Sequence, residues 1–489
     1  MKRSSGIAGI CVLGLFLAVL SLPGNASTDL QEGPKDAKTI QSLGRRFDIV
    51  VVPGKILQRF CNHPLEKLRL YCVQDQSWRS IPFQFDENTP DGGKVLPDEG
   101  PQANPQDSNK VLDPQDELIF MAHDAGSKST GLQIPQDVED SIEIAIVDPL
   151  TKGRTWCYLF YYSGKTPPLS DKRYVYWDWN AQGLDGFLSR SANYRIEGTT
   201  VTFGNHTYKQ IDHDVFRTPP GAGGTDEDYL DHLKWVLEIR LMFGSIKYHM
   251  DFSKITGDLL AMRRGPVRCT SRCWAAVRLP AGVRGPKFVA DVSAWEFSGA
   301  SSVTRLHVPL NPGILVTNIR TRIGEDFSKN AYGMVWLNSH NSQGFMVDGL
   351  MSPMEQAQNP AQDQWRMIVG PQGAVLNRAF WSPNFIKQAN YVKVSWVDDL
   401  QALDPFEFDP GQHAGYSISE VSSIHPGDYD LAIEWYFPPN IYDHRDGSVH
   451  SEIVTEFMNI MDHPLILEAD GQKAESNIRP GALKANIED

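Results

Sequence analysis

The chain has 489 residues, a formal net charge of −14 at pH 7, and a composition of 41% hydrophobic and 22% charged residues. This composition is that of a globular protein, and the length predicts at least two domains. The acidic balance argues against general binding to nucleic acid or to anionic membranes, because phosphate-rich surfaces attract basic proteins.

Residues 1–26 have the pattern of an export signal. A basic start precedes an apolar run from Ile7 to Leu22, and Ala26 ends a small-residue cleavage site. The run is shorter than the roughly 20 residues that a spanning helix needs, so we expect cleavage, with an uncleaved anchor as the alternative. No later stretch is long and apolar enough to cross a membrane. The sequence therefore predicts a secreted or periplasmic protein with a flexible tether over 27–44.

Five cysteines follow the leader, and an oxidising compartment favours pairing among them. Cys61 and Cys72 could close a small loop, which predicts a disulfide. Cys269 and Cys273 fall on one expected strand, where they would lie about 13 Å apart at roughly 3.3 Å per residue, so they could form a bond only if the segment is helical or bulged. The sequence has no motif for covalent attachment of c-type haem.

Residues 45–165 alternate apolar and polar side chains in short runs, as β-strands do. This series predicts an N-terminal β-sandwich. Four aromatic side chains share one face of its last strand, either as core or as a platform for sugar rings: Trp156, Tyr158, Phe160 and Tyr162. The expected strands are 47–52, 68–72, 78–85, 117–122, 141–147 and 154–162.

A long loop over residues 86–115 is rich in Asp, Asn, Pro and Gly. Oxygen ligands crowd around a tight turn there, and calcium prefers a cage of six to eight oxygens. A calcium site would use Asp86, Asn88, Asp91 and Asp116. In the alternative, the loop is solvated and these residues only form turns.

Pro167 and Pro168 mark a domain boundary. The pattern beyond it predicts a larger antiparallel β-sandwich or supersandwich-like domain over 170–470, with few helices, and a flexible tail over 471–489. A second aromatic set lies near its start, either exposed or buried: Tyr174, Tyr176, Trp177 and Trp179.

A hairpin gives the clearest signal in the second part of the chain. Its arms, 237–243 and 246–252, alternate apolar and polar residues around a Gly-Ser pair that fits a type II′ turn. Two helices are expected, at 226–233 and at 451–461. Further strand-like segments are 288–297, 305–309, 313–320, 334–337, 365–370, 391–397 and 429–437.

Basic residues recur at even positions in the strand that follows Pro266, so they would share one face. A row of guanidinium groups attracts anions, and arginine binds carboxylate, sulfate or phosphate bidentately. In the alternative, acidic residues of neighbouring strands neutralise the row. This arginine stripe, with a Trp on which a sugar could stack, is the candidate ligand site: Arg268, Arg272, Trp274 and Arg278, preceded by Arg264.

A third cluster of polar residues precedes the second expected helix. Histidine and carboxylate groups in a Gly-containing loop can bind a divalent metal, whereas the alternative is an ordinary polar loop. The helical spacing of a zinc protease site is not found. The cluster comprises Asp428, Asp430, Asp443, His444, Asp446 and His450.

Three phrases of the sequence resemble a known pattern. Pro-Phe-Gln-Phe-Asp lies at 82–86, Asp-Glu-Leu-Ile-Phe-Met-Ala at 116–122, and Gly-Pro-Val-Arg at 265–268. They resemble uncharacterised secreted bacterial β-sandwich proteins and, more loosely, mutarotase-like supersandwich modules of polysaccharide-active enzymes. The resemblance covers roughly a third of the chain and implies a fold and a carbohydrate context, without a mechanism.

The sequence lacks the serine-hydrolase elbow, the phosphate-binding loop and the dinucleotide fingerprint, so no nucleotide cofactor is expected. It predicts an exported binding protein for a polysaccharide or an envelope protein, assisted by calcium if the acidic loop binds it. One alternative is a lyase or hydrolase of an anionic glycan in which Tyr248 or His249 moves a proton. Another is a structural subunit of an extracellular assembly.

Overall fold

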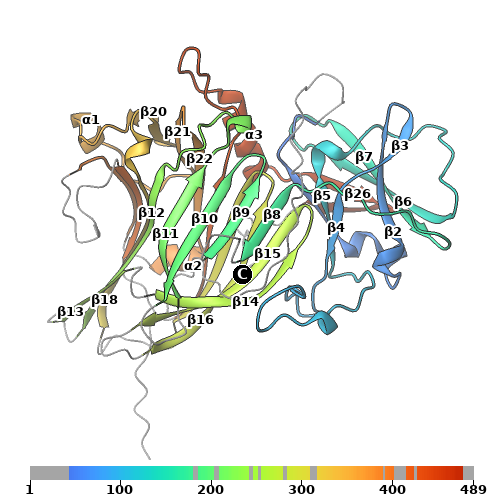
Figure 1. The fold of residues 1–489 in the computed structure, drawn as a ribbon, viewed down its shortest axis with the longest axis horizontal. Helices are drawn as coiled ribbons and strands as arrows, with labels where there is room; N and C mark the ends of the chain where they lie inside the picture. Colours follow the sequence, from blue (N-terminus) through green and yellow to red (C-terminus); the bar gives the residue numbers. More distant parts are fainter. Residues whose placement is uncertain are drawn as a thin grey trace, which may run out of the picture.

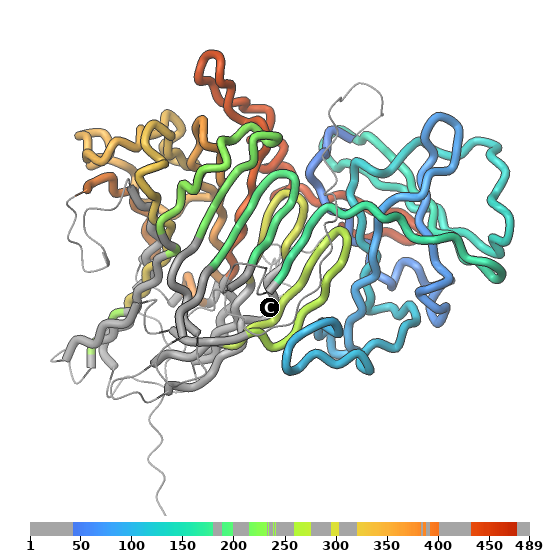
Figure 2. The backbone as a smooth tube through the Cα atoms, in the orientation of Figure 1, coloured from blue at the N-terminus to red at the C-terminus, as the bar shows by residue number. Residues whose placement is uncertain are grey.

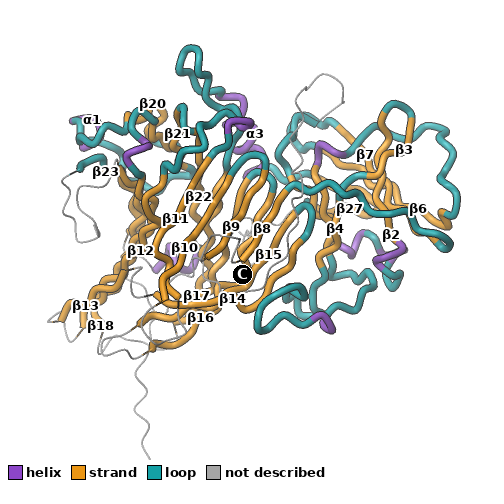
Figure 3. The backbone as a smooth tube through the Cα atoms, viewed as in Figure 1, coloured by secondary structure: helices purple, strands orange, loops and turns teal. Residues whose placement is uncertain are grey.

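The protein is mainly β, as predicted, and Figure 1 and Figure 3 show that strands are the main regular element in both parts of the molecule. In the described part of the chain, the strands form four sheets in which neighbours run antiparallel. The same part contains no helix of the length and apolarity needed to cross a bilayer. The expected leader lies outside the described residues. The computed structural model describes residues 43–179, 186–202, 209–241, 246–251, 255–278, 284–308, 316–388, 391–400, 415–422 and 427–476.

Two sheets form the N-terminal sandwich, whose strands follow the predicted alternation of side chains. The smaller sheet has the order β1 (Ile49–Pro53), β5 (Glu117–Met121) and β4 (Phe83–Asp86). The larger has the order β27 (Gln472–Glu475), β26 (Ile466–Ala469), β6 (Val138–Val147), β7 (Arg154–Tyr162), β2 (Leu68–Gln74) and β3 (Ser77–Ser80).

The smaller sheet lies between two hydrophobic cores because successive residues of a strand point to opposite faces. Val50 and Val52 of β1 pack in the core of the N-terminal sandwich. Ile49 and Val51 face the other way, into a core shared with Phe457 and other residues of the second domain. The two domains are therefore joined by a continuous hydrophobic contact.

The C-terminal strands belong to the N-terminal sandwich, which corrects the predicted domain boundaries. Strand β26 pairs with β6, and β27 pairs with β26, so residues 466–475 extend the first sheet. Figure 2 shows this red segment lying among the blue and teal strands. The boundary predicted at 470 and the tail predicted from 471 are wrong, because apolar residues such as Leu467 complete the first core.

A 13-stranded sheet dominates the second, larger domain, as observed in the described residues. Its order is β20 (Asn341–Met346), β19 (Val335–Asn338), β21 (Arg366–Gly370), β22 (Gly373–Trp381), β25 (Gly427–Tyr436), β17 (Gly299–Val308), β16 (Arg284–Glu296), β15 (Arg268–Arg278), β14 (Ile255–Arg264), β11 (Lys209–Arg217), β10 (Arg195–Thr202), β9 (Gly186–Ser191) and β8 (Val175–Trp179).

A five-stranded sheet packs against one end of the large sheet. Trp396 of β23 stacks on Trp336 of β19 with ring centroids 5.1 Å apart, and Glu325 of β18 accepts a hydrogen bond from Trp435 of β25. These contacts make the large domain a two-layer sandwich. The order of the second sheet is β13 (Ile246–Asp251), β12 (Leu230–Leu241), β18 (Val316–Phe327), β24 (Gly415–Ser422) and β23 (Tyr391–Val397).

The predicted hairpin is confirmed by the pairing of β12 with β13, although its turn lies outside the described residues. Helix α3 (Ser451–Asp462) confirms the second predicted helix. The first, at 226–233, is wrong, because Leu230 pairs with Phe327 and begins β12. The other helices are α1 (Pro353–Gln356) and α2 (Pro383–Gln388), with short 3-10 turns η1 (Gly54–Ile56), η2 (Gln58–Phe60), η3 (Leu65–Lys67), η4 (Pro105–Asp107), η5 (Ala122–Asp124), η6 (Pro220–Ala222) and η10 (Lys329–Ala331).

Candidate functional site

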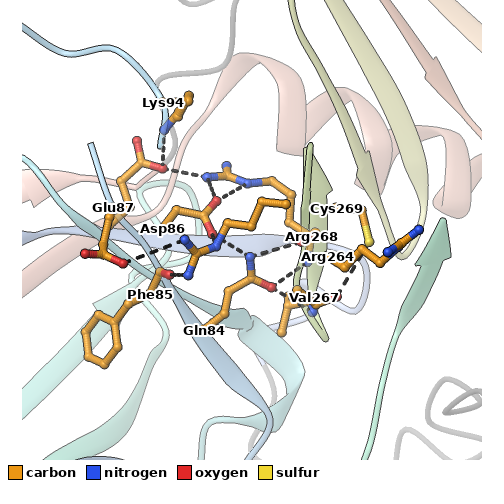
Figure 4. A network of polar contacts seen from close by, with 12 residues as sticks. Gln84, Phe85, Asp86, Glu87, Lys94, Arg264, Val267, Arg268 and Cys269 are labelled. Carbon is orange, nitrogen blue, oxygen red and sulfur yellow. Dashed lines mark hydrogen bonds and ion pairs between the residues drawn. The ribbon is translucent and has the colours of Figure 1, made fainter. Parts of the chain in front are cut away.

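Arg268, the first member of the predicted arginine stripe, lies at the junction of the two domains and is only 8% exposed. Its guanidinium contacts Asp86 at 2.7 Å (Figure 4). It also contacts Glu117 at 2.6 Å. Both acidic partners come from the N-terminal sandwich, at the ends of β4 and β5. Arg268 is therefore satisfied inside the protein, and its predicted role in binding an external anion is not supported by the geometry.

Neighbouring basic side chains at this junction also meet acidic groups. Arg263 lies 3.2 Å from the second carboxylate oxygen of Asp86, and Lys94 lies 2.8 Å from Glu117. Arg264 pairs with Glu99 and Asp178. The sequence left open neutralisation by acidic residues of neighbouring strands; these basic groups are neutralised, but mainly by acidic residues of the N-terminal sandwich.

Gln84 ties the two domains together through its side-chain amide (Figure 4). Its Oε1 accepts hydrogen bonds from the backbone N–H groups of Val267 at 3.0 Å and Arg268 at 2.9 Å. Its Nε2 donates to the Arg268 carbonyl at 3.0 Å and to Asp86 at 2.6 Å. Gly265 leaves room for this amide, because a Cβ there would lie 1.9 Å from Gln84 Oε1.

The three sequence phrases that carried the resemblance therefore meet at one place, the interdomain joint. This joint consists of Gln84 and Asp86 from the first phrase, Glu117 from the second, and Gly265 and Arg268 from the third. Its members bond to one another and are largely buried. The joint serves to dock the domains, and it presents no free reactive group.

Charge pairing shifts the pKa values of the joint. Burial alone would raise the pKa of Asp86, but the guanidinium groups of Arg268 and Arg263 outweigh it and hold that pKa below its usual value. The pKa of Glu117 is lowered in the same way by Arg268 and Lys94 against the effect of burial. Burial would lower the pKa of Arg268, but Asp86 and Glu117 raise it. All three groups are ionised at neutral pH.

These shifts predict a loss of stability in acid. A carboxylate whose pKa is depressed in the folded state stabilises that state at any pH above the pKa it has in the unfolded chain. That unfolded-state pKa is about 3.9 for Asp and about 4.3 for Glu. That contribution is lost as the pH falls through the folded pKa. Chemical denaturation at about pH 6 and about pH 3 should show a lower midpoint in acid, with a smaller drop in Arg268→Met. An equal drop in both proteins would contradict the assignment.

Two further members of the arginine stripe, Arg272 and Trp274, are also unsuited to the predicted role. Arg272 donates a hydrogen bond to the Lys94 carbonyl at 3.4 Å. Trp274 is only 7% exposed and packs against Leu260, so its ring is not available to a sugar. The side chain of Arg278 lies outside the described residues.

The acidic loop does not gather its predicted ligands around one point. Asp86 is occupied by arginine, and the carboxylate of Asp116 accepts backbone N–H groups of Asn88 at 2.9 Å and Asp113 at 2.8 Å. The side chain of Asn88 donates to a carbonyl of the loop, and Asp91 accepts from a threonine hydroxyl. Within the described residues no group of three or more His, Cys, Asp or Glu side chains is placed to hold a metal. Calcium binding stays a prediction of the sequence.

The predicted disulfide is wrong, since Cys61 and Cys72 are both free thiols, as are Cys157 and Cys269. Cys61 follows η2, where its Sγ faces the carbonyls of Gly54 and Leu57 at 3.9 Å. Cys72 lies on β2 and is buried in the first core. Burial raises the pKa of the Cys72 thiol to about 12, so it is not a nucleophile at neutral pH.

The described members of the C-terminal polar cluster are not arranged to hold a metal. Asp443 pairs with Arg445, His444 contacts the Gly223 carbonyl at 2.9 Å, and His450 faces Glu452 at 3.1 Å. The side chains of Asp428 and Asp430 lie outside the described residues. The described members form local contacts, which favours the polar-loop interpretation.

The aromatic sets are mainly buried. Tyr158, Phe160 and Tyr162 pack together on the outer face of the six-stranded sheet, with Trp156 half-buried at its edge. Tyr174 and Trp177 of the second set are also buried. Tyr176 is half-buried and lies next to a line of arginines that the sequence analysis did not predict.

Three arginines lie side by side across strands β9, β10 and β11. Arg190 pairs in register with Arg195, and Arg195 pairs with Arg217. Tyr176 of β8 is the next residue in the same line. Directly opposed residues of antiparallel strands point to the same face, so the four side chains form one line across the sheet. Arg190, Arg195 and Arg217 are called the cross-strand arginine row.

The row is incompletely neutralised by the described side chains. Arg195, whose side chain is 44% exposed, contacts Glu197 on its own strand. Arg217 donates to the Asp226 carbonyl at 2.7 Å. The Arg190 guanidinium lies over the Tyr176 ring, 5.0 Å from its centroid, and its Nε is buried without a hydrogen-bond acceptor. Like charges directly opposed across a sheet repel, so an anion bound to this face would remove that repulsion.

Comparisons with known proteins were made for the whole chain. No protein-family model and no curated protein match it. Solved structures that match include a glycosyl hydrolase family 38 protein from Enterococcus faecalis, with 9% identity, a TM-score of 0.43, and coverage of 90% of this chain and 47% of that chain. An α-mannosidase from Enterococcus faecalis V583 has 10% identity, a TM-score of 0.36, and coverage of 87% and 48%.

The chain thus spans about half the length of these two structures. At such identities and TM-scores, the comparison establishes neither a family nor an activity. The chemistry of the candidate site has to be argued from its own residues. The cross-strand arginine row combines three aligned arginines, one of them exposed, with an aromatic ring next to Arg190.

The sequence contained only part of the signal for this row. Arg190, Arg195 and Arg217 lie on three strands, and each follows the alternation of its own strand. Their alignment depends on the pairing register, which a single sequence does not give. The available signal was the presence of an arginine on each of three consecutive short strands, which is compatible with a cross-strand set.

Proposed function

We propose that this protein binds an anionic polysaccharide through the cross-strand arginine row. The supporting observation is the direct register of Arg190, Arg195 and Arg217, which places three guanidinium groups in a line on one sheet face. Each guanidinium can bind a carboxylate or sulfate with two parallel hydrogen bonds. The proposed ligand, a polysaccharide, is the class that the sequence predicted. The proposed binding site, however, lies on strands β9–β11 and not on the arginine stripe of β15.

A polymer fits the row better than a single small anion. Adjacent strands are about 4.8 Å apart, so three arginines on neighbouring strands offer cations over roughly 10 Å. A chain with a regularly repeated acidic group can use all of them at once. Tyr176, at the end of the row and under Arg190, adds an aromatic edge of the kind that contacts sugar rings.

The electrostatics of the site support binding more than proton transfer. Burial and the hydrogen bond to Asp178 raise the pKa of Tyr176, so its phenol keeps its proton at neutral pH. A lyase would need a base of lowered pKa beside the substrate. The side chains of Tyr248 and His249, which the sequence offered for this role, lie outside the described residues. An exported location, as the leader predicts, would expose the row to envelope or extracellular glycans.

The test is binding of the protein to a polyuronate and to an uncharged glucan of similar length, measured by calorimetry. Charge-assisted hydrogen bonds contribute roughly 1.5–3 kcal/mol each, so Arg195→Gln should weaken polyuronate binding about tenfold or more. Arg154→Gln is the matched control, because Arg154 is also an exposed strand arginine, 48% exposed, with one carboxylate partner at 3.1 Å. Its binding should be unchanged.

Salt provides a second readout of the same site. The chain carries a net charge of −14, so general attraction to a polyanion is not expected, and binding must come from a local basic surface. Affinity should fall with rising salt, less steeply in Arg195→Gln than in the natural protein. Absence of polyuronate binding, or equal loss in Arg195→Gln and Arg154→Gln, would refute the proposal.

A further inference from the structure

An exposed apolar patch lies at the end of the large sheet, around β20 and α1. Tyr332, Met346, Leu350 and Met354 are 37%, 60%, 71% and 61% exposed. They are half of the large hydrophobic residues that are exposed in the described chain, and they fall within one short segment. Figure 1 shows β20 and α1 together at the end of the molecule away from the N-terminal sandwich. This patch is called the β20 patch.

The chain around the β20 patch is held in a defined shape. The buried carboxylate of Asp398 accepts the backbone N–H groups of Asp348 and Gly349, both at 2.7 Å. Ser352 and Glu355 form a reciprocal capping box at the start of α1. Glu355 also accepts a hydrogen bond from the Trp396 indole at 3.0 Å. A preformed surface loses less conformational entropy on binding than a disordered one.

Strand β20 has an open edge in the described structure. It is the first strand of the large sheet and pairs with β19 only. Such an edge presents unpaired N–H and C=O groups and is usually protected by charged residues or proline. The strand Asn341–Met346 contains neither; an irregularity in its pairing with β19 lies near Gly344, whose φ is +73°, and Ser342, Gln343 and Met346 are exposed. The edge is therefore suited to pairing with another strand.

The charge distribution around β20 indicates which strand could pair with its open edge. From Asn330 to Trp365 the chain has no Lys or Arg, and its acidic residues are Asp348, Glu355 and Asp363. Glu355 and Asp363 are buried, so Asp348 is the exposed acid of this segment. Two copies of a chain with a net charge of −14 repel through most of their surfaces, and a nearly neutral end is where they can approach.

We infer that the β20 patch is a self-association surface, at which β20 pairs antiparallel with β20 of a second copy. Antiparallel pairing of one strand with itself obeys a two-fold axis, so the same neutral surface serves both partners. The large sheet would continue across the dimer, and Met346, Leu350 and Met354 would be covered. This inference does not depend on the proposed glycan site, which lies at the opposite end of the sheet order.

Sedimentation velocity of the full chain over a wide concentration range tests the inference. The natural protein should be a dimer that dissociates on dilution. Met346→Lys places a charge in the apolar patch that the dimer would cover and should raise the dissociation constant tenfold or more. Leu169→Lys is the matched control, because Leu169 is 56% exposed on the boundary between the domains, far from β20 in sequence. It should leave the dimer unchanged.

Cysteine crosslinking gives a measurement that does not depend on a destabilising charge. Gln343 is exposed near the centre of β20, so Gln343→Cys should form an intermolecular disulfide on mild oxidation. Leu169→Cys should not. A natural protein that is monomeric at all concentrations, or equal crosslinking of the two cysteine variants, would overturn the inference.

Discussion

Replacement of Arg268 by methionine is expected to lower the free energy of unfolding by about 3–5 kcal/mol, the cost of breaking a buried ion pair from one side. Methionine retains much of the volume of the arginine stem, so the main loss is electrostatic. Asp86 is 2% exposed and Glu117 is half-buried, and Arg268 contacts both within 2.7 Å. Arg263 and Lys94 would still offset part of the unpaired charge.

Arg272→Met is the matched control for this prediction. Arg272 lies on the same strand but contacts only a carbonyl, at 3.4 Å, so its loss should change stability by less than about 1 kcal/mol. Urea denaturation followed by tryptophan fluorescence measures both variants. Adding Asp86→Asn and Glu117→Gln to Arg268→Met should recover part of the loss, because the buried groups are then uncharged. An effect of Arg268→Met no larger than that of Arg272→Met would refute this account of the joint.

Side-chain alternation was enough to predict many elements but not their partners. Strand β7 has the predicted bounds, and helix α3 extends the predicted helix by one residue. Both contain long, regular patterns with a period of two or of 3.6 residues. The segment at 226–233 looked helical, but pairing of β12 with β18 over its whole length overrode the local preference.

Long-range contacts explain why the predicted site was misplaced. The partners of Arg268, Asp86 and Glu117, precede it by more than 150 residues, and nothing in the local sequence connects them. The sequence predicted the stripe as a line of positive charge, with neutralisation as an open alternative. Whether the arginines bind an external anion or are neutralised internally depends on how the two domains dock. A long-range contact of the same kind pairs residues 466–475 with the first sheet.

The same physical reason hid the cross-strand arginine row. A one-residue change of register would move Arg195 to the opposite face of the sheet from Arg190 and Arg217. The register is set by the many pairs along β9, β10 and β11, including a bulge between Thr199 and Thr200. A single sequence specifies each strand's alternation, whereas the line of charge appears only when three strands are aligned.

Gly265→Ala is expected to destabilise the protein by about 2–4 kcal/mol, although it adds a single methyl group. The new Cβ would lie 1.9 Å from Oε1, 2.2 Å from Cδ and 2.3 Å from Nε2 of Gln84. A flexible side chain could move aside at an exposed site, but Gln84 is 7% exposed and is held by four hydrogen bonds. Its displacement leaves the buried N–H groups of Val267 and Arg268 without acceptors.

A double-mutant cycle separates this mechanism from a general intolerance of the turn. If Gly265 is needed only to admit the Gln84 amide, then Gly265→Ala should cost little in a Gln84→Ala background, and the two single effects should be strongly non-additive. Gly221→Ala is the matched control, since no atom lies within 4 Å of a Cβ built there. A full cost of Gly265→Ala in the absence of Gln84 would show that the glycine serves the β14–β15 turn itself. The non-additive result would instead tie two of the sequence phrases, Pro-Phe-Gln-Phe-Asp and Gly-Pro-Val-Arg, to a single role in docking the two domains.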